Sequence, residues 1–129
     1  MKLFAAITTL IFSSVVFAES ITCQITEFAD NKRRQTTVTV LSENDPHGGL
    51  KTFVSELFPE ISGFVSLLQK DDQFFAVMSL YSDTLGTNSS GQYQMVVDGQ
   101  YAQLQLIIPS ESLKMSGIEL LCQFSKPQP

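Results

Sequence analysis

The stretch EISGFVSLLQKDDQFFAVMSLYSD, residues 60–83, decides the fold. Two runs rich in aliphatic and aromatic residues flank Asp71 and Asp72, and aspartate is a common turn residue. If these two residues form the turn, Lys70 pairs with Gln73, and that pairing fixes the register of both strands. The stretch therefore predicts an antiparallel β-hairpin.

This register sorts the hairpin side chains onto two faces, because successive side chains alternate across a strand. One face carries Ile61, Val65, Leu67, Ala76, Met78 and Leu80, and the other carries Phe64, Ser66, Leu68, Phe75, Val77, Ser79 and Tyr81. We expect one face to meet the core. The second face must then be covered or used for binding, since a large exposed apolar patch is unusual on a monomer. Phe64, Phe75 and Tyr81 are therefore the candidate residues for binding a ligand or partner.

Alternation predicts further strands on both sides of this hairpin. ITCQITEF (21–28) and QTTVTVLS (35–42) predict a hairpin around a polar turn. QYQMVVDGQYAQLQLIIPS (92–110) predicts another, in which Asp98-Gly99 is a two-residue turn and Val97 pairs with Gln100. We expect a loop at TLGTNSSGQ (84–92), a last strand at GIELLCQFS (117–125) and a disordered tail at KPQP (126–129).

In the segment before the central hairpin, residues 50–58, the apolar residues repeat with a different period from that of a strand. Leu50, Phe53, Val54, Leu57 and Phe58 recur at helical spacing, and Pro59 follows them. We therefore expect a short amphipathic helix from Leu50 to Phe58 that covers the second apolar face. A strand is the alternative, because Phe53 and Leu57 also share strand parity.

About seven strands and one short helix, joined mostly in sequence order, define an all-β fold class. A mostly antiparallel meander of this kind forms a small closed barrel or a β-sandwich.

The start of the chain has the layout of a secretory signal peptide. Lys2 precedes a mainly apolar run, and Val16 and Ala18 lie where a signal peptidase prefers small residues. The run is shorter than the roughly 20 residues that span a bilayer. We expect a signal peptide at residues 1–18 and a single β-rich domain at residues 19–129. The protein would then be exported, periplasmic or extracellular, with no membrane span after cleavage.

The two cysteines, Cys23 and Cys122, lie near the two ends of the expected domain. Each shares parity with apolar residues of its strand, so both thiols should point inward. In an oxidising compartment two such cysteines pair, and we expect a structural disulfide between the first and last strands. A metal site with His47 offers too few ligands, and a redox pair would have closer spacing.

The composition excludes some classes of function. The chain has 8 Lys and Arg against 13 Asp and Glu, which disfavours nucleic-acid binding. The single histidine, His47, has no accompanying catalytic motif, so we expect an exposed loop residue. We expect no metal, no cofactor and no enzymatic activity, although a site built without short motifs stays an alternative.

These observations favour a small exported, non-catalytic binding module. Its apolar sheet face would hold a small apolar ligand or a protein partner of unknown identity. The alternative is a secreted or periplasmic inhibitor of a hydrolase that acts through a loop, either Ser42–Gly49 or Asp83–Gly91. The sequence does not define the oligomeric state.

Overall fold

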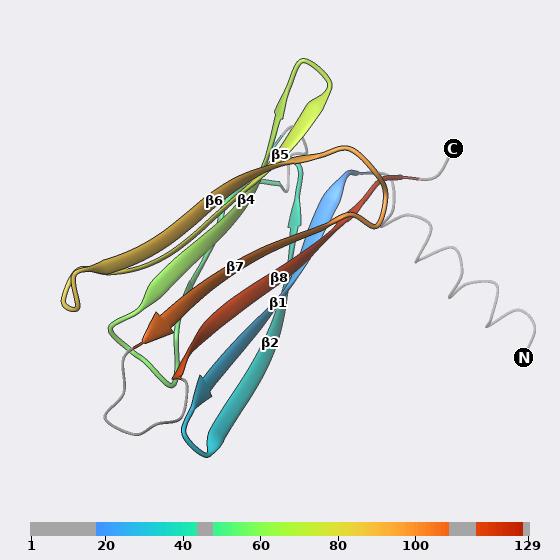
Figure 1. Cartoon of the computed structure of the whole chain (residues 1–129). Helices are drawn as coiled ribbons and strands as arrows, with labels where there is room; N and C mark the ends of the chain where they lie inside the picture. The colour runs from blue at the N-terminus through green and yellow to red at the C-terminus, as the bar shows by residue number, and fades with distance from the viewer. Residues whose placement is uncertain (1–17, 44–47, 109–115, 128–129) are drawn as a thin grey trace, which may run out of the picture.

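The computed structural model describes residues 18–43, 48–108 and 116–127, and in these residues the chain is all-β (Figure 1). Within them the strands are β1 (Ser20–Ala29), β2 (Lys32–Leu41), β3 (Lys51–Val54), β4 (Ser62–Lys70), β5 (Gln73–Ser82), β6 (Thr87–Met95), β7 (Tyr101–Ile108) and β8 (Ser116–Ser125). They form two four-stranded sheets, sheet A in the order β2-β1-β8-β7 and sheet B in the order β3-β4-β5-β6. Every pairing is antiparallel.

The two sheets follow a meander that is interrupted twice. Each strand pairs with a neighbour in sequence, and β1 also pairs with β8, but β2 does not pair with β3 and β6 does not pair with β7. The described strands therefore do not close into a barrel. The sheets instead face each other across one core, in a sandwich-like arrangement.

Both inner faces supply this core. The residues predicted for the inner face of the central hairpin are all buried: Ile61, Val65, Leu67, Ala76, Met78 and Leu80. Across the core, the rings of Phe74 and Phe124 have centroids 5.6 Å apart. Side-chain alternation along each strand therefore produces the apolar layer, as the sequence predicts.

The predicted disulfide is confirmed. Cys23 of β1 lies directly opposite Cys122 of β8, and the two are bonded. Both side chains are buried, and the Cys122 sulfur lies 3.2 Å from the sulfur of Met78 in sheet B. The bond therefore joins the first and last strands at the centre of the core.

Two predicted hairpins are confirmed. β1 and β2 pair along their whole lengths around Asp30 and Asn31. In the central hairpin, β4 and β5, Lys70 pairs with Gln73. Asp71 and Asp72 both have positive φ, 52° and 65°, as a tight two-residue hairpin turn requires.

The hairpin predicted at Asp98-Gly99 is wrong in its pairing. A turn is present, since Gln100 N donates to Val97 O over 3.0 Å and Gly99 has φ of 85°. However, β6 belongs to sheet B and β7 to sheet A. The Gln100 side-chain oxygen accepts from the backbone N–H of Val96 and Val97, while Gln100 O accepts from Phe124 N in β8. These bonds carry the chain from one sheet to the other.

The predicted helix from Leu50 to Phe58 is wrong, and the strand alternative holds for part of it. Lys51–Val54 forms the short edge strand β3, followed by turns. A Cβ atom on Gly63 would lie 2.3 Å from the ring of Phe53, so the missing side chain lets the ring lie against this glycine. This cross-strand packing of Phe53 on Gly63 outweighs a weak helical preference.

The predicted loop at residues 84–92 is also wrong for most of its length. Strand β6 begins at Thr87, and only a short turn separates it from β5. Hydrogen bonding to β5 along nine residue pairs overrides the low strand propensity of Asn88, Ser89, Ser90 and Gly91. The described chain therefore contains eight strands rather than about seven.

A buried carboxylate links the two sheets. Glu27 of β1 is 3% exposed, and its Oε1 accepts from the Ser55 hydroxyl, from Glu56 N over 2.9 Å and from Leu57 N over 3.3 Å. Its other oxygen lies 3.9 Å from Arg34 Nε. Glu27 thus fixes the β3–β4 connection of sheet B against sheet A.

Candidate binding face

The three candidate residues lie on one face, the outer face of sheet B. Phe64 lies on β4, and Phe75 and Tyr81 lie on β5, all on the side away from the core. Phe64 and Phe75 are partly buried by their neighbours, and Tyr81 is 38% exposed. The parity of the hairpin places all three on this face, as the sequence predicts.

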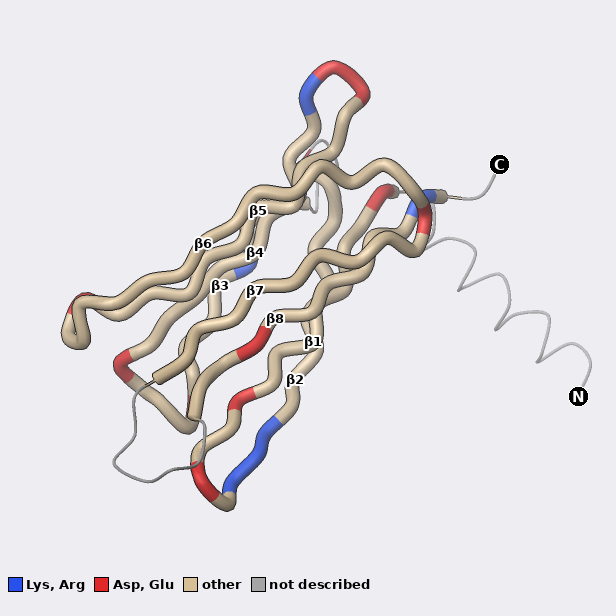
Figure 2. The backbone as a smooth tube through the Cα atoms, in the orientation of Figure 1, with Lys and Arg blue, Asp and Glu red and all other residues tan. Residues whose placement is uncertain are grey.

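The rest of this face is uncharged over most of its area. The register adds the apolar residues Val54, Leu68 and Val77 and the polar residues Thr52, Ser62, Ser66, Ser79, Asn88, Ser90, Gln92 and Gln94. Among the described strand residues with this orientation, Lys70 alone is charged, and it adjoins the hairpin turn. Figure 2 shows β5 and β6 without charged residues along their lengths. We call this surface the outer face of sheet B.

No helix covers this face in the part of the chain that the structure describes. The segment expected to cover it contributes β3 to the same sheet and adds Val54, which is 62% exposed, to the outer face. The apolar stripe on β4 and β5 therefore stays open to solvent among the described residues.

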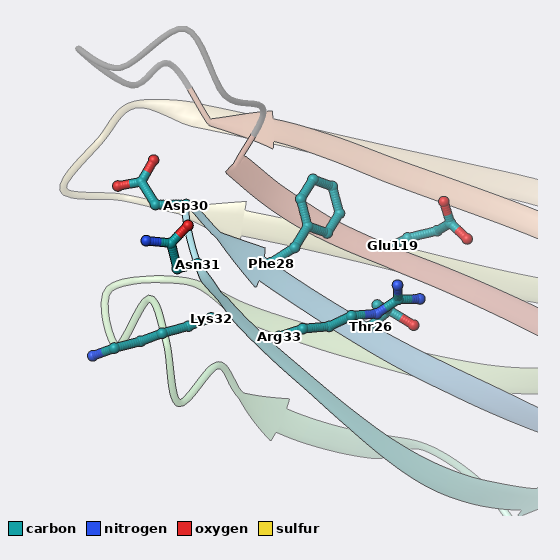
Figure 3. Close-up of a pocket in the computed structure, with 7 residues that line it drawn as sticks. All are labelled: Thr26, Phe28, Asp30, Asn31, Lys32, Arg33 and Glu119. Atoms are coloured by element: carbon teal, nitrogen blue, oxygen red, sulfur yellow. The ribbon is translucent and has the colours of Figure 1, made fainter.

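The basic run Lys32-Arg33-Arg34 opens β2, and its third residue has a structural role. Arg34 Nη2 donates to Glu56 Oε1 over 2.7 Å, next to the Glu27 carboxylate. Lys32 and Arg33 instead line an open hollow of about 430 Å³ at the β1–β2 turn, on the outer side of sheet A (Figure 3). This hollow is not predicted from the sequence.

Apolar, polar and charged side chains line the hollow in Figure 3. Thr26 and Phe28 come from β1, Glu119 comes from β8, and Asp30 and Asn31 form the turn. Cations and carboxylates are mixed along its wall, so the hollow has no single charge preference for a ligand.

The other features considered in the sequence lie partly outside the described residues. In the described residues no group of three or more His, Cys, Asp or Glu is arranged to hold a metal ion, and no helix is long and apolar enough to cross a membrane. His47 lies outside the described residues, as does part of the predicted loop Ser42–Gly49. Of the second predicted loop, Asp83–Gly91, only residues 83–86 lie outside a strand.

Comparisons of this chain with protein-family models, with curated proteins and with solved structures find no match.

Proposed function

We propose that this protein is a small exported, non-catalytic binding module that holds a protein partner on the outer face of sheet B. The observation that carries the proposal is the grouping of Phe64, Phe75 and Tyr81 on one uncovered sheet face. Aromatic residues are enriched in protein interfaces, and these three lie along the face among uncharged polar residues.

The shape of the surface favours a protein over a small apolar ligand. Small ligands bind in concave pockets that cover most of their area, whereas a sheet face offers a broad, open surface. Between the sheets, the core side chains of both pack into one cluster. The buried disulfide supports export, because such bonds persist mainly in oxidising compartments.

The first experiment replaces Phe75 with the photo-crosslinking residue benzoylphenylalanine and exposes the protein to the exported fraction of its host. The partner that is captured is then purified, and its affinity is measured for the wild type and for Phe75→Ser and Tyr81→Ser. We expect both variants to weaken binding by about 30-fold, which corresponds to about 2 kcal/mol for a central interface residue.

Ile107→Ser is the matched control, since Ile107 is an apolar residue, 45% exposed, on the outer side of sheet A. It should leave the affinity unchanged. Equal affinities for wild type and Phe75→Ser would refute the proposal. A small mass that stays with the protein in native mass spectrometry, and that Phe75→Ser removes, would replace the protein partner with an apolar ligand.

The second candidate function is inhibition of a hydrolase through the β5–β6 turn. It is favoured by Leu85, which is 47% exposed at the tip of that hairpin. Exchanging residues 83–86 for an unrelated turn separates the two functions. The exchange should abolish inhibition of a captured hydrolase if the turn binds, and should have no effect if the outer face of sheet B binds.

A further inference from the structure

A second hollow lies on the outer side of sheet A, away from the face discussed above. It has a volume of about 280 Å³ and is open to solvent. Its lining residues come from all four strands of the sheet: Thr22 and Gln24 of β1, Thr37 of β2, Tyr101 of β7, and Leu121 and Gln123 of β8.

The register explains why these residues meet. Gln123 lies directly between Thr22 and Tyr101 in one row across the sheet. In the next row, Gln24 lies between Thr37 and Leu121. The hollow therefore lies on the strands of the sheet rather than on a loop, and the strand register fixes the neighbours of its side chains.

The lining has no charged side chain. Tyr101 and Leu121 provide apolar surface, and the Tyr101 side chain is 61% exposed, so its ring is accessible. Thr22, Thr37, Gln24 and Gln123 provide hydroxyl and amide groups, and each glutamine amide can both donate and accept.

Neighbouring contacts orient two of these polar groups. The Thr22 and Thr39 hydroxyls lie 3.1 Å apart, within hydrogen-bond distance. The Gln123 Nε2 donates to Gly99 O over 3.4 Å, which directs the amide nitrogen toward the β6–β7 connection.

A ligand for this hollow must match both kinds of surface. A purely apolar molecule would remove the four polar side chains from water without replacing their hydrogen bonds, which is unfavourable. An ion would find no opposite charge. A sugar ring fits, because one side of it presents C–H groups that pack on an aromatic ring and its edge presents hydroxyls that pair with amides.

We infer that this hollow is a subsite for one uncharged sugar ring of a glycan, with Tyr101 as the stacking surface and Gln24 and Gln123 as hydroxyl partners. The site lies on the opposite sheet from the outer face of sheet B, and therefore does not depend on the function proposed above. Thr26, two residues beyond Gln24 on β1, lines the hollow in Figure 3.

Affinity electrophoresis of the disulfide-bonded protein tests this inference. The gels contain dextran, galactomannan, xyloglucan or mixed-linkage β-glucan as uncharged probes, and polygalacturonate or heparin as anionic probes. We expect retardation by at least one uncharged polysaccharide. Tyr101→Ala should weaken it about tenfold or more, whereas Tyr101→Phe, which keeps the ring, should stay within about twofold of the wild type.

Ile107→Ala is the control variant, because Ile107 lies on the same strand and the same outer side but does not line the hollow. It should bind as the wild type does, and so should Phe75→Ser from the other sheet. Tyr101 is exposed, so its substitution should leave the thermal unfolding temperature nearly unchanged.

Three results would overturn the inference. The first is the absence of retardation by every uncharged polysaccharide. The second is equal retardation of wild type and Tyr101→Ala. The third is binding to the anionic probes alone that disappears at high salt, because such binding would depend on Lys32 and Arg33 rather than on the uncharged hollow.

Discussion

Glu27 is the residue whose replacement tests the packing of the two sheets most directly. Its carboxylate is almost completely buried and accepts three hydrogen bonds from the β3–β4 connection. The Ser55 hydroxyl in turn accepts from Phe58 N over 2.9 Å. Replacing Glu27 with Ala removes the acceptor for a hydroxyl and two backbone N–H groups at once.

The expected loss follows from these bonds. A hydrogen bond to a charged group contributes about 1.5–3 kcal/mol, but Glu56 and Leu57 lie near the surface, so water can replace part of the loss. We expect Glu27→Ala to lower the free energy of unfolding by about 4 kcal/mol, in the range for breaking a buried charged contact. Glu27→Gln keeps one oxygen acceptor but loses the charge, and should cost about 2 kcal/mol.

Arg34→Met is the matched control. The Arg34 side chain is 44% exposed, lies 3.9 Å from the Glu27 carboxylate and donates to the exposed Glu56 carboxylate over 2.7 Å, so both ion pairs are screened by solvent. Its removal should cost at most about 1 kcal/mol. Urea unfolding measures all three variants, and a shift of the midpoint at constant slope reports the change in stability.

Amide hydrogen exchange adds a local measurement. In Glu27→Gln, exchange at Glu56 and Leu57 should accelerate more than exchange in the centre of β1, because these amides lose a charged acceptor. If Arg34→Met costs as much as Glu27→Ala, the contacts of Arg34 with Glu27 and Glu56 hold the sheets, rather than the hydrogen bonds that Glu27 accepts from the connection.

Two further predictions concern the core. Reduction of the buried disulfide should lower the free energy of unfolding by about 4–5 kcal/mol, because the bond closes a loop with a sequence separation of 99 residues. Urea unfolding with and without reductant measures this loss. A loss under about 1 kcal/mol would contradict the prediction. Gly63→Ala should lower the free energy of unfolding by about 1–3 kcal/mol, because the new methyl group meets the Phe53 ring. Combining it with Phe53→Ala should cost less than the sum of the two single changes. Strict additivity in thermal or urea unfolding would show that the two residues do not interact.

Local alternation was sufficient to predict much of this fold. The pairing of Lys70 with Gln73 and the inward direction of Cys23 and Cys122 follow from a period of two residues, which a single strand displays by itself. The grouping of Phe64, Phe75 and Tyr81 on one face follows from the same register.

The predictions of the Asp98-Gly99 hairpin and of the helix at Leu50–Phe58 are wrong because contacts between distant residues override the local conformational preference of the chain. Nothing in the residues around Asp98-Gly99 shows that Gln100 pairs with Phe124 rather than within a hairpin. The helical spacing around Phe53 gave no sign of Gly63, whose missing side chain accommodates the ring. The hollow at Tyr101 depends on four strands in a fixed register, and a sequence read strand by strand does not define that register.

The distribution of charge supports a binding role for the broad faces of the molecule. Solubility could be provided by Lys and Glu side chains on the outer faces, as is usual for exposed sheet surfaces. Instead, most charged residues lie in turns or near strand ends (Figure 2), while the outer face of sheet B and the Tyr101 hollow present aromatic, hydroxyl and amide groups. The inward-facing Arg34 also gives edge strand β2 a charge that opposes pairing with another chain. Charge at these positions favours solubility, and the uncharged parts of these surfaces can lose water to a partner without the cost of burying an ion.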